Sequence, residues 1–328
     1  MRGRGPTRGL VLGKFLPPHL GHLHLVEFAR GFVDELTVVV GTLAREPIPG
    51  ELRHRWMREL VPGARVLHLA EELPQDPSED PRFWDLWRES LLRLLGGERP
   101  DFVFASEPYG ARLAQELGAR FVPVDLARAA VPVSGTRIRE DPLGHWDLIP
   151  RCVRPHFVKR VCVFGPESTG KTTLARRLAE RFDTAWVPEY ARTWLEARGG
   201  EPAFEDLVTI ARGQVASEDA LARNARGVLL CDTDPLLTTI WSEVLFGKVA
   251  PELEEIARAR TYDLYLLLNV DVPWVRDPVR YLPDERRSFF ERCRTRLERE
   301  ERRYIIIEGP WAEREARAQA AVEAILSR

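Results

Sequence analysis

The sequence has few cysteines, little net charge and no long apolar run. Its four cysteines, Cys152, Cys162, Cys231 and Cys293, never show the CxxC spacing of a metal site or redox pair, so we expect reduced thiols in the core. The 48 Lys and Arg residues and 50 Asp and Glu residues give a formal charge of -2, which provides no global field for nucleic acid or membranes. No segment approaches the roughly 20 apolar residues of a membrane span, and the N-terminus lacks the apolar part of a signal peptide. We therefore expect a cytoplasmic protein without nucleic-acid or membrane partners.

At 328 residues the chain is longer than a typical single domain. Short apolar runs alternate with amphipathic helical patterns, which predicts βαβ units and parallel sheets. A basic segment with two prolines, IPRCVRPHFVK at 149–159, separates two such halves. We predict an α/β fold with two doubly wound parallel-sheet domains, 1–150 and 151–328. The expected strands are Leu10–Gly13, Leu36–Gly41, Arg65–Leu69, Asp101–Ser106 and Arg120–Asp125, then one from Arg160, Ala185–Pro188, Gly227–Asp232, Asp263–Asn269 and Tyr304–Glu308.

One segment of the first half, Phe83–Leu95, has apolar residues at helical spacing. Trp84, Trp87, Leu91 and Leu94 would share one face of this helix. We interpret that face as a core contact and assign it no chemistry.

Residues 165–172 read GPESTGKT and match the phosphate-binding pattern G-x-x-x-x-G-K-[ST] between a predicted strand and a predicted helix. In such a loop the backbone wraps the β-phosphate of ATP, Lys171 reaches the β- and γ-phosphates, and the Thr172 hydroxyl binds Mg²⁺. Asp232 ends a later strand, where P-loop folds place a metal-side carboxylate; helix capping is the alternative. The expected residues of this ATP site are Gly165, Glu167, Ser168, Thr169, Gly170, Thr172, Thr173 and Arg280, with Lys171 and Asp232 catalytic and Thr172 and Asp232 on Mg²⁺.

The segment PEYAR follows the second strand of this half, at the sheet edge where acceptor substrates approach. Glu189 can accept from ribose hydroxyls, and Tyr190 can stack on an aromatic cation; an ordinary strand-to-helix turn is the alternative. A later segment, WVRDPVR at 274–280, has the composition of a lid with arginines for the transferred phosphoryl group, or of a solvated surface. The expected substrate-binding residues are Glu189, Tyr190, Arg192, Trp274 and Asp277.

In the first half, the first strand leads into GKFLPPHLGH and then a predicted helix. Two imidazoles, His19 and His22, at a helix N-terminus make an anion site suited to a triphosphate, although such a pair also caps or packs. Gly21 permits close approach of the backbone. A second segment, SGTRIRE at 134–140, follows the fifth strand and adds hydroxyl and guanidinium groups. The expected ATP-binding residues are Gly13, Lys14, Phe15, Gly21, Ser134, Gly135, Thr136 and Arg137, with His19, His22 and Arg139 catalytic.

Together these two segments resemble the HxGH nucleotidyltransferase superfamily. In that chemistry a nucleotide phosphate attacks the α-phosphorus of ATP, so positioning and charge neutralisation dominate and Mg²⁺ bridges the phosphates. Trp56 is a candidate for stacking on the acceptor base, with Arg53 or Arg55 at its phosphate, although burial of Trp56 in the core fits equally well. Further candidates at the ligand-facing edge of the sheet are Ser106, Glu107, Asp125 and Arg128.

The order of HxGH, SGTRIRE, RPHFVKRV, GPESTGKTT, PEYAR and CDTD resembles the NadR family over nearly the whole chain. The resemblance implies that the first domain joins nicotinamide mononucleotide (NMN) and ATP into NAD and pyrophosphate. It also implies that the second phosphorylates nicotinamide riboside to NMN with ATP and Mg²⁺. Some members carry an N-terminal helix-turn-helix; the first strand here begins near Leu10, so we expect no direct DNA binding. The alternatives are a fused adenylyltransferase and kinase of coenzyme A synthesis, or an NAD- or ATP-sensing regulator with one inactive half. The sequence leaves the oligomeric state open, a homo-oligomer included.

Overall fold

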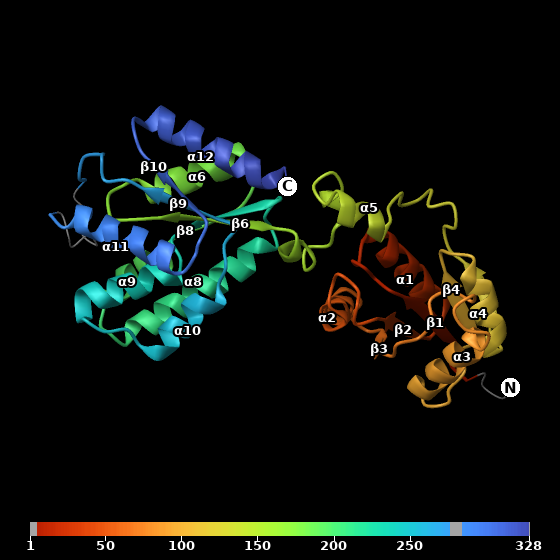
Figure 1. Cartoon of the computed structure of the whole chain (residues 1–328). Helices are drawn as coiled ribbons and strands as arrows, with labels where there is room; N and C mark the ends of the chain where they lie inside the picture. The colour runs from red at the N-terminus through yellow and green to blue at the C-terminus, as the bar shows by residue number, and fades with distance from the viewer. Residues whose placement is uncertain (1–4, 276–283, 328) are drawn as a thin grey trace. The chain divides into compact units, whose positions relative to one another are not determined.

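The structure is a computed structural model that describes residues 5–275 and 284–327. The chain divides into two compact units, Met1–Val153 and Arg154–Arg328. Both are built around a parallel sheet with helices on its faces (Figure 1). Within the described ranges, no helix has the length and apolar character needed to cross a bilayer.

The first unit contains a five-stranded sheet in the order β3-β2-β1-β4-β5, with all neighbours parallel. Neighbouring residues of β1 point to opposite faces of this sheet: Val11 packs with α1 and α2, whereas Leu10 packs with α3 and α4. The strands are β1 (Arg8–Gly13), β2 (Glu35–Gly41), β3 (Arg65–Leu69), β4 (Phe102–Ala105) and β5 (Arg120–Pro123). The helices are α1 (Leu20–Phe32), α2 (Gly50–Leu60), α3 (Phe83–Leu94), α4 (Tyr109–Leu117), α5 (Gly135–Glu140) and the short η1 (Trp146–Leu148).

The second unit contains another parallel sheet, in the order β10-β9-β6-β8-β7. Helices α6 and α12 bury Leu174 and Val322 against one face, and α8, α9 and α10 pack together away from them (Figure 1). The strands are β6 (Lys159–Phe164), β7 (Trp186–Val187), β8 (Val228–Asp232), β9 (Leu264–Leu268) and β10 (Tyr304–Ile307). The helices are η2 (Arg154–His156), α6 (Lys171–Arg181), α7 (Tyr190–Arg198), α8 (Asp206–Ala222), α9 (Pro235–Phe246), α10 (Pro251–Ala259), α11 (Arg286–Arg299) and α12 (Trp311–Leu326).

The predicted fold class is confirmed: each predicted strand is present, with ends within two residues of those expected. Apolar runs buried on both faces are typical of parallel strands, which explains why these segments could be identified. The predicted helix at Phe83–Leu95 is α3; Leu91 is buried, and Trp84, Trp87 and Leu94 pack against the same core while partly exposed. The four cysteines are free and buried.

Candidate active sites

A cavity of about 660 Å³ opens in the first unit beyond the carboxyl ends of its strands. This is the edge at which open α/β sheets bind ligands, and the volume suits a nucleotide. The cavity wall brings together most of the predicted adenylyltransferase residues. They are Gly13, Lys14, Phe15, His19, Gly21, His22, Ser134, Gly135, Thr136 and Arg139, with Ser106, Glu107, Asp125 and Arg128.

The two histidines of the HxGH segment both cap α1 and line the cavity. His19 is the N-cap: its Nδ1 accepts from the His22 backbone N–H at 3.3 Å, and His22 Nδ1 accepts from the His19 backbone N–H at 3.3 Å. Their rings stack at 3.6 Å between centroids. Capping therefore fixes both Nδ1 atoms as acceptors and leaves each Nε2 as the N–H of the neutral ring.

Burial keeps both rings uncharged in the ligand-free protein. Desolvation and then the charge of Arg128 lower the pKa of His19 to about 4. Desolvation, followed by the charges of His19 and Arg128, lowers the pKa of His22 well below its ordinary value. A bound triphosphate would favour the charged form of either ring, because an adjacent negative charge raises the pKa of a base.

The segment Ser134–Glu140 is held against the loop after β1. Arg139 donates through Nη1 to the carbonyl of Leu16 and through Nη2 to Thr136 Oγ1 at 3.3 Å. A Cβ on Gly135 would lie 2.3 Å from the Leu16 carbonyl oxygen, so only glycine fits here. Ser134 caps α5 by accepting from the backbone N–H of Arg137 at 3.3 Å.

Three residues of the first unit that we predicted to bind ligand do not line the cavity. Trp56 is 5% exposed and packs in the core outside the cavity wall, so the stacking prediction is wrong and the core alternative holds. Arg53 is fully buried: it donates to the carbonyls of Ile48 and Lys14 and pairs with Glu46, which leaves it no role at a substrate phosphate. Arg137 is exposed and does not line the cavity.

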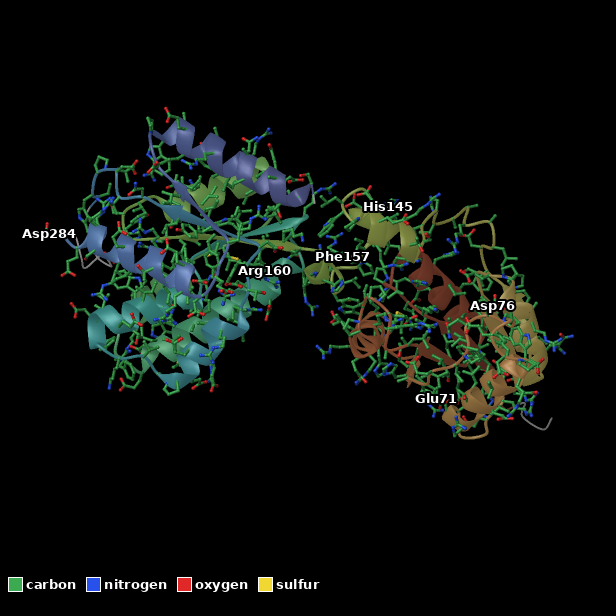
Figure 2. The ribbon with its side chains drawn as sticks, viewed as in Figure 1. Glu71, Asp76, His145, Phe157, Arg160 and Asp284 are labelled. Carbon is green, nitrogen blue, oxygen red and sulfur yellow. The ribbon has the colours of Figure 1, made fainter. Side chains whose placement is uncertain are left out.

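Several side chains of the cavity wall were not singled out from the sequence. Trp84 and Trp87, which we interpreted only as core, also face the cavity, and Trp87 Nε1 donates to the Pro74 carbonyl at 2.9 Å. Glu71 accepts from Ser90 Oγ at 2.6 Å (Figure 2). The aromatic residues of α3 were the one available signal, because they follow a predicted strand on the ligand side. The others in this group are Thr42, Glu46, Gln75, Phe83 and Tyr109.

In the second unit the GPESTGKT segment forms a tight loop between β6 and α6. Gly165 and Gly170 have φ of 131° and 89°, and Ser168 also has a positive φ of 56°. The Lys171 ammonium donates to the carbonyl of Pro166 at 2.9 Å, within the loop. These left-handed positions fold the backbone into the concave form that binds phosphate. Upstream of this loop, near the start of β6, the backbone N–H of Arg160 donates to Asp263 Oδ2 at 2.8 Å (Figure 2).

Thr172 and Asp232 meet at the start of α6, as predicted for the metal side of the site. The Thr172 hydroxyl donates to Asp232 Oδ2 at 2.5 Å. Burial, followed by the charge of Glu189, raises the pKa of Asp232 to about 7. The helix cap is the neighbouring Asp234, which accepts from the backbone N–H of Leu237 at 2.9 Å.

A cavity of about 150 Å³ lies beside this loop, bounded by α6, α7, α8 and α9. Glu189 and Arg192 line it, together with Glu167, Ser168, Gly170, Lys171, Thr172 and Thr173. Tyr190 does not: its ring packs over Gly213, where a Cβ would lie 2.1 Å from it. Among the described residues, the aromatic side chain in the wall is Trp241 of α9, joined by Gln214 and Thr238; no motif in the sequence pointed to these three.

The predicted lid lies largely outside the described residues. Asp277 and Arg280 are not described, so their predicted roles stay predictions. Trp274 is partly buried outside the cavity wall, with the Arg286 guanidinium 5.8 Å from its ring centroid.

Comparison with known proteins agrees with both halves. Residues 160–314 match a family described as an AAA domain. The chain is 31% identical to the trifunctional NAD biosynthesis/regulator protein NadR of Escherichia coli (strain K12), over 84% of this chain and 72% of that protein. The nicotinamide-nucleotide adenylyltransferase of Aeropyrum pernix is 34% identical over 53% of this chain and 98% of its own length.

Solved structures resemble nearly the whole chain. A NadR protein crystallised with NR has a TM-score of 0.83 and 26% identity, covering 98% of this chain and 96% of that one. A NadR protein with NAD and AMP-PNP has a TM-score of 0.78 and 26% identity, covering 99% and 97%. With a relative above 30% identity that it matches over most of both lengths, the chain belongs to the NadR family.

Proposed function

We propose that this chain makes NAD in two ATP-dependent steps, with one step in each half. Residues 151–328 phosphorylate nicotinamide riboside to NMN, and residues 1–150 join NMN to the adenylyl group of a second ATP, releasing pyrophosphate. The observation that carries this proposal is the presence of two separate phosphate-binding cavities, each lined by the motif of its own reaction. NadR relatives of known structure were crystallised with NR and with NAD and AMP-PNP, which supports the same pair of substrates.

In the first unit, the chemistry needs alignment and charge neutralisation more than proton transfer. The NMN phosphate is already a nucleophile, and negative charge grows on the leaving pyrophosphate. The Nε2–H groups of His19 and His22 and the guanidinium of Arg139 are the donors that would stabilise this charge, because all three side chains line one cavity. Lys14, Ser134 and Thr136 would hold the triphosphate in place.

In the second unit, a ribose hydroxyl attacks the γ-phosphorus of ATP; the bond from that phosphorus to the β,γ-bridging oxygen breaks, ADP leaves, and the hydroxyl proton is released. The loop backbone and Lys171 would hold the β- and γ-phosphates. Glu189 lies in the same cavity and would accept from the ribose hydroxyls, while Arg192 would offset phosphate charge. Trp241 is the aromatic side chain of this wall, so it would contact the nicotinamide ring.

The residues at Thr172 and Asp232 fit Mg²⁺. Among the described residues, Asp232 Oδ1 is buried without a hydrogen-bond partner, and the Thr172 hydroxyl lies beside the same carboxylate. Oxygen donors of this kind are those that Mg²⁺ prefers. When bound, the ion would supply positive charge to the phosphates, and Thr172 and Asp232 would hold it.

The two alternatives that the motifs left open are less well supported. A coenzyme A enzyme would share the two motifs, yet the similarity to NadR runs through both units and the segment between them. A sensor with one inactive half would be expected to have lost motif residues, and here Lys171, Asp232, His19 and His22 keep their places at the two sites.

Separate sites predict separable losses. Lys171→Ala should abolish the kinase and leave adenylyl transfer from supplied NMN unchanged, because the lysine donates to the P-loop carbonyl of Pro166 and lines the cavity of the second unit. His22→Ala should do the reverse. Both activities are measured on each purified variant, so the retained activity shows that the protein is folded. Equal loss of both activities from either substitution would refute the two-site account.

A further inference from the structure

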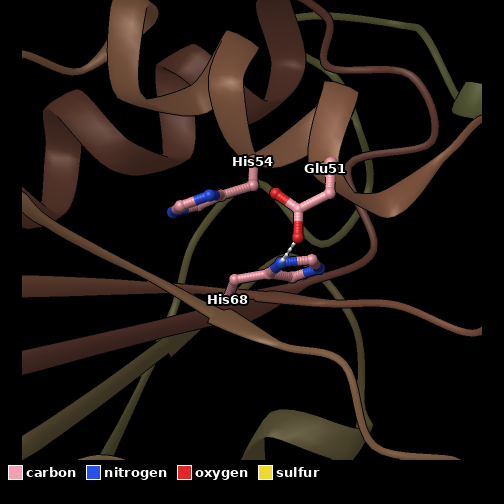
Figure 3. Close-up of side chains that lie close together, drawn as sticks. All are labelled: Glu51, His54 and His68. Atoms are coloured by element: carbon pink, nitrogen blue, oxygen red, sulfur yellow. Dashed lines mark ion pairs between the residues drawn. The ribbon is translucent and has the colours of Figure 1, made fainter.

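Two histidines and a glutamate of the first unit gather outside the adenylyltransferase cavity wall. Glu51 and His54 lie one turn apart on α2, and His68 lies on β3, the edge strand of the sheet. Each offers one ligand atom, and these three atoms all lie within 4.8 Å of one another (Figure 3). The His54 and His68 rings stack with centroids 5.2 Å apart and planes 16° apart.

The spacing of these atoms is close to that of a metal site. Zinc bonds to nitrogen and oxygen are about 2.1 Å long, so two ligand atoms of a tetrahedral site lie roughly 3.4 Å apart. Glu51 Oε1 and His68 Nδ1 are 3.2 Å apart. The remaining separations are at most 4.8 Å, so binding needs the half-buried rings of His54 and His68 to turn until one nitrogen of each faces the same point; the exposed side chain of Glu51 (79%) is free to follow.

The surroundings of His68 orient its ring as metal-binding histidines are oriented. Its Nε2 is 2.8 Å from Thr42 Oγ1, and if that nitrogen donates, Nδ1 presents a lone pair toward Glu51. His54 Nε2 is 3.5 Å from the Val66 carbonyl oxygen, which can accept a hydrogen bond from that nitrogen as Thr42 Oγ1 can from His68. Gly50 leaves room for the Thr42 contact, since a Cβ there would lie 2.6 Å from Thr42 Oγ1 and 3.0 Å from His68 Nε2.

From this geometry we propose that Glu51, His54 and His68 form a binding site for a divalent transition-metal cation of the zinc class. Two imidazole nitrogens and one carboxylate oxygen suit zinc, cobalt or nickel better than magnesium, which prefers oxygen alone. Three protein ligands leave a fourth position for water, on the exposed side of Glu51. The bound ion would tie α2 to the edge strand, and through Thr42 it would reach the wall of the adenylyltransferase cavity.

The competing account is a metal-free chain of hydrogen bonds, in which the Thr42 hydroxyl donates to His68 Nε2 and His68 Nδ1–H donates to the Glu51 carboxylate. Equilibrium dialysis of the full, untagged chain against Zn²⁺, without nucleotide, distinguishes the two. If the site exists, each chain should bind one Zn²⁺ ion tightly. With Co²⁺ in place of zinc, the protein should show the intense visible absorption of tetrahedral cobalt. Glu51→Gln, His54→Gln and His68→Gln should each weaken binding at least about tenfold.

Two controls keep the outcome decisive. His24→Gln removes an exposed histidine outside the cluster and should bind as the wild type does. Glu51→Gln changes a surface side chain and should keep the metal-free melting temperature, while zinc should raise that temperature in the wild type and not in this variant. The proposal is overturned if the wild type binds no zinc tightly, or if the three variants bind zinc as tightly as the wild type. It is also overturned if His22→Ala, and none of the three cluster variants, abolishes zinc binding.

Discussion

Arg53 is an example of a charged side chain whose role the sequence could not disclose. The sequence made it, like Arg55, a candidate ligand of the acceptor phosphate, yet the fold buries it completely and pairs it with Glu46. Its neighbour Arg55, two residues along α2, is exposed. Which side of a helix faces the core depends on tertiary packing, so the two arginines could not be distinguished from composition alone.

Arg53→Ala should therefore lower the free energy of unfolding of the first unit by about 3 kcal/mol, because it removes the buried partner of Glu46 Oε2. It also removes the hydrogen bonds to the carbonyls of Ile48 and Lys14, and it leaves Glu46 its ion pair with Lys14. Urea denaturation measures this loss. Arg55→Ala, the matched control, should change the free energy by less than about 0.5 kcal/mol. Similar small effects from both substitutions would contradict a structural role for Arg53.

His19 makes a prediction about pH. Its folded pKa of about 4 lies below the ordinary value of 6.5, so its contribution to stability is complete above pH 6.5 and is lost as the pH falls toward 4. The full loss corresponds to about 3 kcal/mol at 1.36 kcal/mol per pKa unit. An NMR titration of the His19 ring should show no protonation between pH 7 and 5.5. A midpoint near 6.5 would contradict the buried, neutral ring.

At the scale of elements, the P-loop could be predicted closely because its function depends on backbone shape, which the glycines encode. Gly170 has φ of 89°, and a Cβ at this position would lie 2.1 Å from the ring of Trp311 at the start of α12. The contact between loop and α12 was not predictable, since Trp311 lies 141 positions after Gly170 in the sequence. Because of this contact, a side chain at position 170 is excluded by Trp311 as well as by the backbone conformation of the motif.

Gly170→Ala should reduce the kcat/KM of the kinase for ATP at least about tenfold, a loss of about 1.4 kcal/mol in transition-state binding. Adenylyl transfer, assayed on the same sample, should be unchanged. Gly199→Ala is the matched control: its φ of 75° is also left-handed, but a Cβ there meets nothing within 4 Å. If both substitutions impaired the kinase equally, backbone strain rather than the clash with Trp311 would be the cause.

The strands and motif loops were predictable because each depends on a local pattern. The composition of the cavity walls was not. Trp87 was assigned to the core alone, and it packs there but also lines the first cavity; Tyr190 was assigned to the acceptor, whereas its ring covers Gly213. Trp241 lines the second cavity from α9, whose sequence PLLTTIWSEVLF contains none of the predicted motifs. These assignments depend on which helix packs beside which strand end, and that is a tertiary property.

At the scale of the whole molecule, each unit has its own sheet, core and phosphate-binding cavity. The two reactions are chemically consecutive, because the NMN made by the kinase is the nucleophile of the adenylyltransferase. One chain therefore carries the predicted motifs of both steps, each in a cavity of its own unit.

The most direct test of this account is product analysis of the purified full chain with Mg-ATP and either nicotinamide riboside or NMN. The account predicts NAD from both substrates, with NMN appearing first when the riboside is supplied. NAD from NMN alone would leave the adenylyltransferase and contradict the proposed substrate of the kinase. NAD from neither substrate would contradict the central claim.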